Sequence, residues 1–186
     1  MALTPSNMMK LGTKAPDFNL YDVKSENYKT LNDVRGKHGT VVMFICNHCP
    51  FVKHVNEEIV RLANDYTVTG FGFVAISSND VENYPEDHPD KMVIVAEEEK
   101  YPFPYLYDET QEVAKAYDAA CTPDFYVFDE NLELFYRGQL DDSRPKNGIP
   151  LSGRSIREAL DDILNNRDCP KLQKPSMGCN IKWKTS

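Results

Sequence analysis

The pattern of apolar residues along the chain changes its period at residue 46. Residues 40–45, Thr-Val-Val-Met-Phe-Ile, are β-branched or apolar without a break, which is typical of a strand buried on both faces of a sheet. From residue 52 onward, apolar side chains recur at steps of three and four, as on one face of a helix. These positions are Val52, Val55, Ile59, Leu62, Ala63 and Tyr66, and Lys53, His54, Glu57, Glu58 and Arg61 remain for the solvent face. The pattern therefore predicts a core strand followed at once by an amphipathic helix.

The same criteria place the other elements. The apolar run at residues 70–78 follows the helix, so strand, helix and strand form a right-handed parallel unit. Residues 101–107 contain two prolines and predict a short or edge strand. We expect hairpins within residues 11–31 and 125–138, helices at 89–100 and 109–118, and a closing helix in which Ser155 and Glu158 form a capping box. Together these elements predict an α/β fold with a central mixed β-sheet flanked by helices and an N-terminal β-hairpin extension.

Two segments show no regular period. Residues 79–90 hold Pro85, Pro89 and several acids at the carboxyl end of the second core strand, where α/β sheets often bind ligands. This loop either walls the site at residue 49 or is a solvated acidic loop. Residues 167–186 form a C-terminal tail with enough apolar side chains to lie against the body. We predict a single domain over residues 1–186, with its core at about 11–166.

Composition narrows the class of protein. A chain of 186 residues is large enough for one domain with its own core. The net charge of −8 and the isoelectric point near 5.0 argue against nucleic acid or an anionic membrane surface as the main partner. The N-terminal residues lack the features of a signal peptide, and no segment has the length of a transmembrane helix. We therefore expect a cytoplasmic protein whose five cysteines rest mainly as thiols.

The candidate chemistry lies where the core strand meets the helix, in the sequence Cys46-Asn-His-Cys49-Pro50. Proline suits the first helical position, so Cys49 is expected at or near the N-cap. Unpaired backbone N–H groups and the helix dipole stabilise a thiolate at that place. Two cysteines at this spacing in such a turn indicate a redox pair more than two buried structural cysteines. A structural zinc site is disfavoured, because Cys169 and Cys179 do not form a second closely spaced ligand pair.

The two residues between the cysteines each have more than one role open to them. His48 either lowers the pKa of the thiolate and donates a proton to a leaving thiol, or only occupies an exposed turn. Asn47 favours the turn conformation and bonds to local backbone. Both are candidate site residues, His48 in catalysis and Asn47 in contact with substrate.

The order of elements resembles the thioredoxin-like superfamily over residues 11 to about 166. Three segments are similar to the redoxin branch, which contains the alkyl hydroperoxide reductase and thiol-specific antioxidant relatives. They are Gly12-Thr-Lys-Ala-Pro-Asp-Phe-Asn-Leu20, Phe125-Tyr-Val-Phe-Asp129 and Gly153-Arg-Ser-Ile-Arg-Glu-Ala-Leu160. A narrower subfamily, described only as thioredoxin family proteins, resembles Cys46-Asn-His-Cys-Pro-Phe-Val-Lys-His54 and Cys121-Thr-Pro-Asp-Phe125.

The resemblance implies that the Thr122-Pro123 peptide bond is cis and packs against the active cysteine. It also implies that the Thr122 backbone pairs with an extended peptide or thiol substrate; the other interpretation of this segment is an ordinary turn. The chain departs from the usual thioredoxin pattern, since the nucleophilic cysteine matches Cys49 and the resolving cysteine matches Val52. The pair is shifted one helical turn upstream, so either Cys46 or Cys49 could attack, and the helix terminus favours Cys49.

A peroxidase would need two further groups. Peroxiredoxins, by the same resemblance, carry Thr-x-x-Cys-Pro and a distant arginine that together hold the peroxide. Here Cys46 takes the place of the threonine, and Pro123 takes the place of the arginine. Arg137 or Arg144 would have to substitute, so a thiol-dependent peroxidase is the less favoured alternative.

We predict a thiol-disulfide oxidoreductase that acts on a protein or small-molecule disulfide or thiol. Its redox pair is Cys46 and Cys49, and Cys121 is either a third redox thiol or a small buried residue. The candidate catalytic residues are Cys46, His48, Cys49 and Cys121, and the candidate substrate-binding residues are Asn47, Thr122 and Pro123. No organic cofactor or metal is required. Electrons would come from a thioredoxin, glutaredoxin or glutathione system, or would pass in the opposite direction to a client.

Two other classes of function stay open. Thiolates and an imidazole suit Cu(I) or Zn in a metal carrier or sensor, and the chain offers them at Cys46, His48, Cys49 and Cys121. The fold could also serve as a binding module with unreactive thiols. Cys169 and Cys179 lie in or near the tail and are expected to be bystanders.

Overall fold

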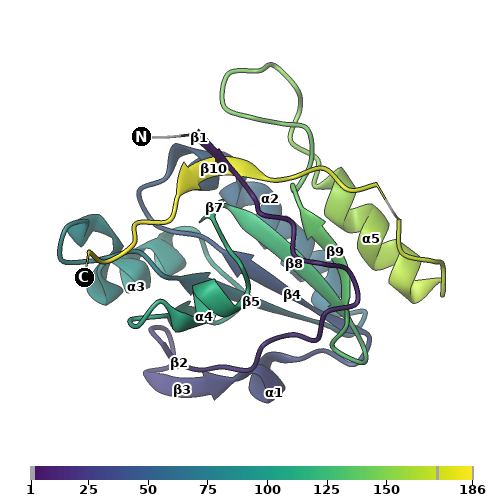
Figure 1. Ribbon diagram of the computed structural model, residues 1–186, viewed down its shortest axis with the longest axis horizontal. Helices are drawn as coiled ribbons and strands as arrows, with labels where there is room; N and C mark the ends of the chain where they lie inside the picture. The colour runs from purple at the N-terminus through teal and green to yellow at the C-terminus, as the bar shows by residue number, and fades with distance from the viewer. Residues whose placement is uncertain (1–2, 171, 186) are drawn as a thin grey trace.

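The computed structural model describes residues 3–170 and 172–185. They form a seven-stranded mixed sheet with helices on both of its faces, and a second sheet of three strands (Figure 1). The large sheet has the strand order β3-β2-β6-β5-β4-β8-β9. Its strands are β2 (Asn19–Asp22), β3 (Asn27–Thr30), β4 (Gly39–Phe44), β5 (Phe71–Ser77), β6 (Tyr105–Tyr107), β8 (Asp124–Asp129) and β9 (Leu134–Gly138). The small sheet consists of β1 (Leu3–Pro5), β10 (Met177–Asn180) and β7 (Cys121–Thr122). The helices are α1 (Leu31–Val34), α2 (Pro50–Thr67), α3 (Pro89–Glu98), α4 (Glu112–Ala116) and α5 (Arg154–Leu164), with a 3-10 turn η1 at Pro85–Asp87.

The predicted core strand is β4, and it lies in the middle of the large sheet. All six of its residues are buried. It pairs in parallel with β5 and antiparallel with β8, so Phe44 lies opposite Ile76 on one side and Asp124 on the other. The predicted parallel unit and both predicted hairpins are thereby confirmed. The segment 101–107 gives a short strand, as expected, but β6 lies between β2 and β5 and is not an edge.

Alternate residues of β4 face two hydrophobic cores. Val41 and Met43 pack in the cluster that contains buried side chains of α2, α3 and α5. Val42 and Phe44 pack in the cluster that contains buried side chains of α1 and α4. The predicted apolar face of α2 is buried throughout. Each helix within the described ranges is too short or too polar to cross a membrane.

Glu58 corrects the predicted solvent face of α2. Its side chain is buried, and its carboxylate pairs with the guanidinium of Arg157 at 2.7 Å and with that of Arg61 at 3.2 Å. Arg157 comes from α5, so a largely buried ion pair joins two helices on the same face of the sheet. The helical period could not show this, because Glu58 and Arg157 are 99 residues apart in the chain.

The predicted capping box of the closing helix is not formed. α5 begins at Arg154, its N-cap is Gly153 at a φ of 64°, and Glu158 pairs with Arg154. The reason lies in the preceding loop, where the carboxylate of Asp141 accepts the Gly153 N–H at 2.7 Å. Ser155 is consequently inside the helix, where its side chain does not cap the first turn.

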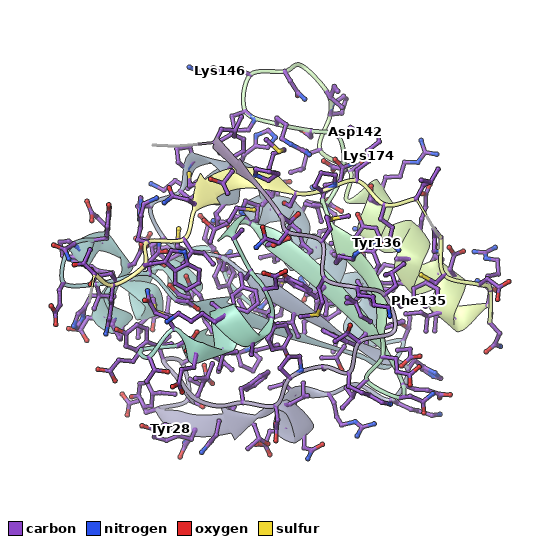
Figure 2. All side chains as sticks on the ribbon, in the orientation of Figure 1. Tyr28, Phe135, Tyr136, Asp142, Lys146 and Lys174 are labelled. Carbon is purple, nitrogen blue, oxygen red and sulfur yellow. The ribbon has the colours of Figure 1, made fainter. Side chains whose placement is uncertain are left out.

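The C-terminal tail contains a strand that the sequence pattern does not predict. β10 pairs antiparallel with β1 and with β7, which places Cys179 opposite Thr122. Figure 1 shows the yellow β10 beside the purple β1, so segments near the two ends of the chain lie together. Before β10, Lys174 pairs with Asp142 at 2.7 Å, at the base of the long loop that carries Lys146 (Figure 2). The tail thus returns from α5 to the part of the molecule that holds the cysteine motif.

Candidate active site

The two cysteines of the motif lie at the strand-to-helix junction. Cys46 follows β4, and Cys49 is the N-cap of α2, with Pro50 in the first helical turn. Neither side chain reaches the surface, since Cys46 is 2% exposed and Cys49 is 0% exposed. The Thr122 hydroxyl oxygen lies 3.4 Å from the Cys46 sulfur, and the Thr122 carbonyl oxygen lies 3.2 Å from the Cys49 sulfur. Thr122 therefore contacts both members of the pair.

The sulfur of Cys49 is stabilised as an anion by the groups around it. The Cys46 thiol donates to it, as do the Cys179 thiol and the Val52 backbone N–H, and these donors outweigh burial. They lower the pKa of Cys49 to about 5. The pKa of Cys46 is raised well above its ordinary value, first by its hydrogen bond to Cys49 and then by burial and the charge of Asp87. At neutral pH, Cys49 is consequently the thiolate and Cys46 the thiol.

Thr122 and Pro123 form a turn that borders both sulfurs. The peptide bond between them is cis, and Thr122 is the last residue of β7. The hydroxyl of Ser176, in the tail, donates to the carbonyl oxygen of Pro123. The turn and the tail therefore close over Cys49.

Cys121 is a buried thiol beside this turn. Its sulfur lies 3.8 Å from the Pro123 carbonyl oxygen. Burial, with the charge of Asp124 adding to it, raises the pKa of the Cys121 thiol. No hydrogen bond among the described residues joins Cys121 to Cys46 or Cys49, so its role as a third redox thiol stays a prediction.

The loop at residues 79–90 contacts the cysteine motif directly, and the alternative of a solvated loop is wrong. Asp87 is fully buried and accepts the Asn47 backbone N–H at 2.8 Å and the Asn79 side-chain amide at 2.7 Å. The carboxylate of Asp87 also lies 2.7 Å from Nδ1 of His48. This hydrogen bond raises the pKa of His48. Burial opposes ionisation of Asp87, but the hydrogen bonds from His48 and Asn79 outweigh it and lower the pKa of Asp87.

A potential metal-ligand set lies in the same place. The Cys46 sulfur, one nitrogen of His48 and one carboxylate oxygen of Asp87 lie within 4.8 Å of one another, and zinc accepts donors of these three kinds. The structure thus groups Asp87, which sequence reasoning did not include, with Cys46 and His48. Because His48 already bonds to Asp87 and Cys46 holds its proton, a metal would have to displace both a hydrogen bond and a proton.

Asn47 supports the shape of the turn. Its side-chain amide donates to the Glu86 carbonyl oxygen at 2.9 Å, and its oxygen accepts the Tyr105 hydroxyl at 3.0 Å. The residue is buried among these partners. Its contact with substrate stays a prediction.

Cys179 was expected to be a bystander in the tail, and its position beside Cys49 corrects that expectation. Its sulfur lies 2.8 Å from the sulfur of Cys49, although the two residues are 130 positions apart. Only a long-range strand pairing brings them together, and β10 is four residues long with a glycine in it, so no local signal could have found it. Cys169 contacts the Phe135 carbonyl oxygen at 2.7 Å instead.

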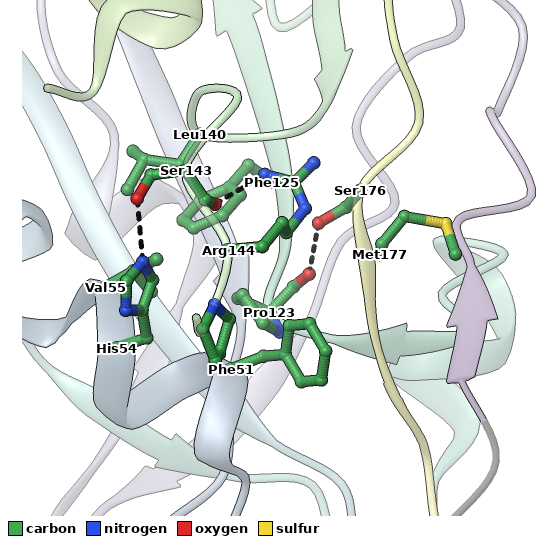
Figure 3. Close-up of a pocket in the computed structure, with 11 residues that line it drawn as sticks. Phe51, His54, Val55, Pro123, Phe125, Leu140, Ser143, Arg144, Ser176 and Met177 are labelled. Carbon is green, nitrogen blue, oxygen red and sulfur yellow. Dashed lines mark hydrogen bonds between the residues drawn. The ribbon is translucent and has the colours of Figure 1, made fainter. Parts of the chain in front are cut away.

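A pocket borders the cis turn on its Pro123 side, as Figure 3 shows. Phe51 and Pro123 give it an apolar wall, and Arg144 and His54 give it polar groups. His54, which was expected on the solvent face of the helix, is half-buried here, with Nε2 2.8 Å from the Ser143 hydroxyl. The cavity has a volume of about 10 Å³, which is enough for about one water molecule, and neither Cys46 nor Cys49 lines it.

A sequence model of the AhpC/TSA family matches residues 11–137, which is more than half of the chain. The chain belongs to the AhpC/TSA family. The match confirms the resemblance to the redoxin branch, while the narrower resemblance carried by residues 46–54 stays a prediction. No curated protein matches this AhpC/TSA-family chain.

Solved structures share the fold of this AhpC/TSA-family protein. An uncharacterized conserved protein from Geobacillus kaustophilus is 65% identical with a TM-score of 0.98, and the alignment covers 100% of this chain and 98% of that chain. A hypothetical protein from Sinorhizobium meliloti 1021 is 44% identical with a TM-score of 0.95, covering 98% of this chain and 100% of that chain. A putative thiol:disulfide interchange protein DsbE from Chlorobium tepidum is 18% identical with a TM-score of 0.63, covering 84% and 99%. The predicted thioredoxin-like fold, a central mixed sheet flanked by helices, is thereby confirmed.

Proposed function

We propose that this AhpC/TSA-family protein is a thiol-disulfide oxidoreductase with Cys49 as its attacking thiolate. The observation that carries the proposal is the environment of the Cys49 sulfur, which lies at the N-terminus of α2 and accepts hydrogen bonds from two thiols and a backbone N–H. The structure describes all five cysteines, and the pKa is lowered at Cys49 and raised at the other four. A thiolate that persists at neutral pH is what disulfide exchange requires.

The reaction has two exchange steps. The Cys49 thiolate attacks one sulfur of the substrate disulfide, forms a mixed disulfide and releases the other sulfur as a thiolate. Cys46 then loses its proton and attacks the Cys49 sulfur, so the Cys46–Cys49 disulfide forms and the second substrate thiolate leaves. The two protein sulfurs supply the two electrons that reduce the substrate, Cys46 supplies one proton, and the second proton comes from solvent. A thioredoxin, glutaredoxin or glutathione system would restore the two protein thiols.

His48 and the cis turn have supporting roles in this proposal. Asp87 raises the pKa of His48, and one His48 nitrogen lies within 4.8 Å of the Cys46 sulfur. An imidazolium there can protonate a leaving thiolate. Thr122 and Pro123 border the reacting sulfur, and the Thr122 carbonyl oxygen lies 3.2 Å from it.

Mass spectrometry of the metal-free protein, stepped through defined glutathione ratios, tests the proposal. Wild type is expected to lose two hydrogens reversibly and to yield a Cys46–Cys49 disulfide on peptide mapping. Cys49→Ser is expected to abolish the reversible step, whereas Cys121→Ser, which removes a neighbouring buried thiol, is expected to keep it. Unchanged reversible oxidation of Cys49→Ser would overturn the assignment of the nucleophile.

A thiol-dependent peroxidase is the second candidate, because the chain belongs to the AhpC/TSA family. The two arginines that could replace the missing peroxide-binding group are engaged elsewhere. Arg137 donates to the Met9 carbonyl oxygen at 2.7 Å, and Arg144 donates to the Asp141 carbonyl oxygen at 2.6 Å. Peroxide consumption supported by a thioredoxin system and abolished by Cys49→Ser would favour this candidate over disulfide exchange alone.

A metal carrier or sensor is the third candidate, and the grouping of Cys46, His48 and Asp87 is the observation in its favour. Protein purified without chelator would then hold a stoichiometric metal ion that is lost in Cys46→Ser and in His48→Ala. Metal-free protein with a reversible disulfide would count against it.

A further inference from the structure

Cys179 reaches the active site through the small sheet. β10 pairs antiparallel with β7, and the register sets Cys179 opposite Thr122. The sulfurs of Cys179 and Cys49 are 2.8 Å apart, which is about 0.8 Å more than the ~2.05 Å length of an S–S bond. A small displacement is therefore enough to join them.

The pairing of β10 has the form expected of an extended substrate. A peptide that bonded to the backbone at Thr122 would run along β7 and bring its own cysteine toward Cys49. β10 already occupies this edge of β7. It is held there by the Ile181 N–H, which donates to the Ala120 carbonyl oxygen at 3.0 Å, and by the pairing with β1. The chain thus presents one of its own cysteines where a substrate thiol would lie.

We propose that Cys179 is a second resolving thiol and that a Cys49–Cys179 disulfide is a working redox state of this protein. The inference deepens the proposed function and rests on it, because Cys49 must first act as the attacking thiolate. It assigns a catalytic residue outside the C-x-x-C motif and outside residues 11–137, the part that the family model matches.

The step balances as a thiol-disulfide exchange. The Cys49 thiolate attacks a disulfide R–S–S–R′, and R′–S⁻ leaves. Cys179 loses its proton, and its sulfur attacks the Cys49 sulfur of the mixed disulfide. The Cys49–Cys179 bond forms, the bond to R–S breaks, and R–S⁻ takes up the proton. The two electrons that reduce the substrate disulfide come from the two protein thiols.

The first step makes Cys179 easier to deprotonate. In the reduced protein, burial, the hydrogen bond to Cys49 and the charge of Cys49 raise the pKa of Cys179 to about 12. A mixed disulfide on Cys49 carries no charge, so the two contributions from Cys49 vanish. The ammonium of Lys182, which favours the thiolate of Cys179, remains. Cys179 is therefore inert at rest and becomes more acidic once Cys49 has reacted.

The same strand must open before a substrate can reach Cys49, whose side chain has no exposed surface. β10 pairs with β7 at only two positions, so few hydrogen bonds hold it against the cis turn, and its other partner, β1, is a strand of three residues. Short pairings of this kind open at low free energy. β10 opens, Cys49 attacks the substrate, and β10 returns with Cys179.

Reaction of the full-length protein with oxidised glutathione separates the two resolving thiols. Cys46→Ser is expected to form a Cys49–Cys179 disulfide and to keep no glutathione on Cys49. Cys46→Ser/Cys179→Ser is expected to keep one glutathione on Cys49, because both resolving thiols are gone. Cys46→Ser/Cys169→Ser is the matched control: Cys169 precedes β10 but contacts Phe135, so the disulfide to Cys179 should still form. Intact mass and peptide mapping identify each product.

Two results would contradict the inference, and they are distinguishable. If Cys46→Ser keeps as much glutathione on Cys49 as the double variant does, Cys179 does not resolve the mixed disulfide, while Cys49 remains the nucleophile. If the double variant takes up no glutathione on Cys49, the proposed function fails as well. A second double variant with Cys179→Ala, checked by circular dichroism, separates a loss of folding from a loss of the thiol.

Discussion

At the scale of single residues, Cys49 shows how a sulfur anion is kept in a place that water does not reach. Burial alone would raise the pKa of a thiol, as it does at Cys121. At Cys49 the hydrogen bond from Cys46 is the largest opposing influence, and the donors Cys179 and Val52 add to it. The acidity of Cys49 therefore depends on which neighbours keep their protons.

The first prediction concerns this dependence. The ultraviolet absorbance of the thiolate, taken as wild type minus Cys49→Ser, should titrate with a midpoint near the pKa of about 5. Thiolate should be present above that pH and lost below it. Cys46→Ala removes the main donor and should move the midpoint upward, while Cys121→Ala should not move it. A wild-type midpoint near the ordinary thiol value of about 8.5 would contradict the assignment.

The second prediction concerns Asp87, whose carboxylate accepts hydrogen bonds from the motif backbone and from His48. Asp87→Asn should lower the pKa of His48 toward its ordinary value and reduce the free energy of unfolding by about 1–3 kcal/mol, as for loss of hydrogen bonds to a buried charged group. Because the folded-state pKa of His48 is raised and that of Asp87 is lowered, the pair contributes its full stability between the ordinary pKa values of the two groups. That contribution is lost as pH rises through the folded-state pKa of His48 or falls through that of Asp87. An NMR titration of the imidazole and urea unfolding measure the two effects.

Asp90→Asn is the matched control for this prediction, because Asp90 is an exposed partner of another imidazole, that of His88. It should leave the pKa of His48 and the unfolding free energy nearly unchanged. An Asp87→Asn variant with a wild-type His48 titration would show that Asp87 does not set the charge of His48.

At the scale of elements, the docking of β10 depends on one glycine. A Cβ on Gly178 would lie 2.0 Å from the backbone oxygen of Thr122, and a backbone atom in β7 cannot move aside as a flexible side chain can. Gly178 therefore permits the close approach of β10 to β7 that sets Cys179 beside Cys49.

The third prediction follows from this contact. Gly178→Ala should displace β10 and raise the rate at which a disulfide reagent modifies Cys49 by about tenfold or more, since overpacking of this kind costs about 1–3 kcal/mol. The measurement is reagent consumption assigned to Cys49 by peptide mapping. Leu172→Ala changes an exposed side chain of the same tail and should leave the rate unchanged. Equal rates in Gly178→Ala and wild type would mean that β10 does not limit access.

The fourth prediction concerns the ion pair between α2 and α5. Glu58→Gln removes the buried charge that faces Arg157 and should lower the unfolding free energy by about 2 kcal/mol. This loss is smaller than that expected on breaking a fully buried ion pair, because Arg157 is partly exposed. Glu57→Gln is the control, since Glu57 pairs with Arg61 on the surface and exposed pairs contribute below about 1 kcal/mol. Chemical denaturation measures both. Equal effects of the two substitutions would contradict a special role for Glu58.

At the scale of the whole molecule, two alternative disulfides would constrain the chain very differently. Cys49 and Cys179 are 130 positions apart, whereas Cys46 and Cys49 are neighbours in one turn. The fifth prediction is that oxidation stabilises Cys46→Ser more than it stabilises wild type. In the chain-entropy description, the Cys49–Cys179 disulfide of Cys46→Ser raises the unfolding free energy by roughly 5 kcal/mol, and the Cys46–Cys49 disulfide of wild type raises it by roughly 2 kcal/mol. Urea unfolding of oxidised and reduced samples measures this. No gain on oxidation of Cys46→Ser would indicate that the long loop is not closed.

Local sequence patterns were sufficient to predict the core strand, the helix that follows it and the position of Cys49 between them. β4 and the buried face of α2 followed from hydrophobic period, and the place of Cys49 at the helix start followed from Pro50. These features depend on residues within a few positions of each other, so a single sequence contains the information that fixes them.

The remaining parts of the site could not be predicted, because distant residues determine them. The burial of Glu58 depends on Arg157, and the place of Cys179 depends on a strand of four residues that pairs with one of two. Asp87 is an intermediate case. Its loop was expected near the site from topology, but its bonds to Asn47 and His48 depend on how residues about 40 positions apart pack together.

The pairing of β10 with β7 also has a consequence for the order in which the protein is made. On the ribosome, residues 39–123 emerge before β10, so β4, α2 and the cis turn are available while the strand that covers Cys49 is still unsynthesised. The nascent chain therefore carries Cys49 uncovered until β10 has been made and has paired with β7. Newly made molecules, more than mature ones, should be captured by cellular disulfides at Cys49.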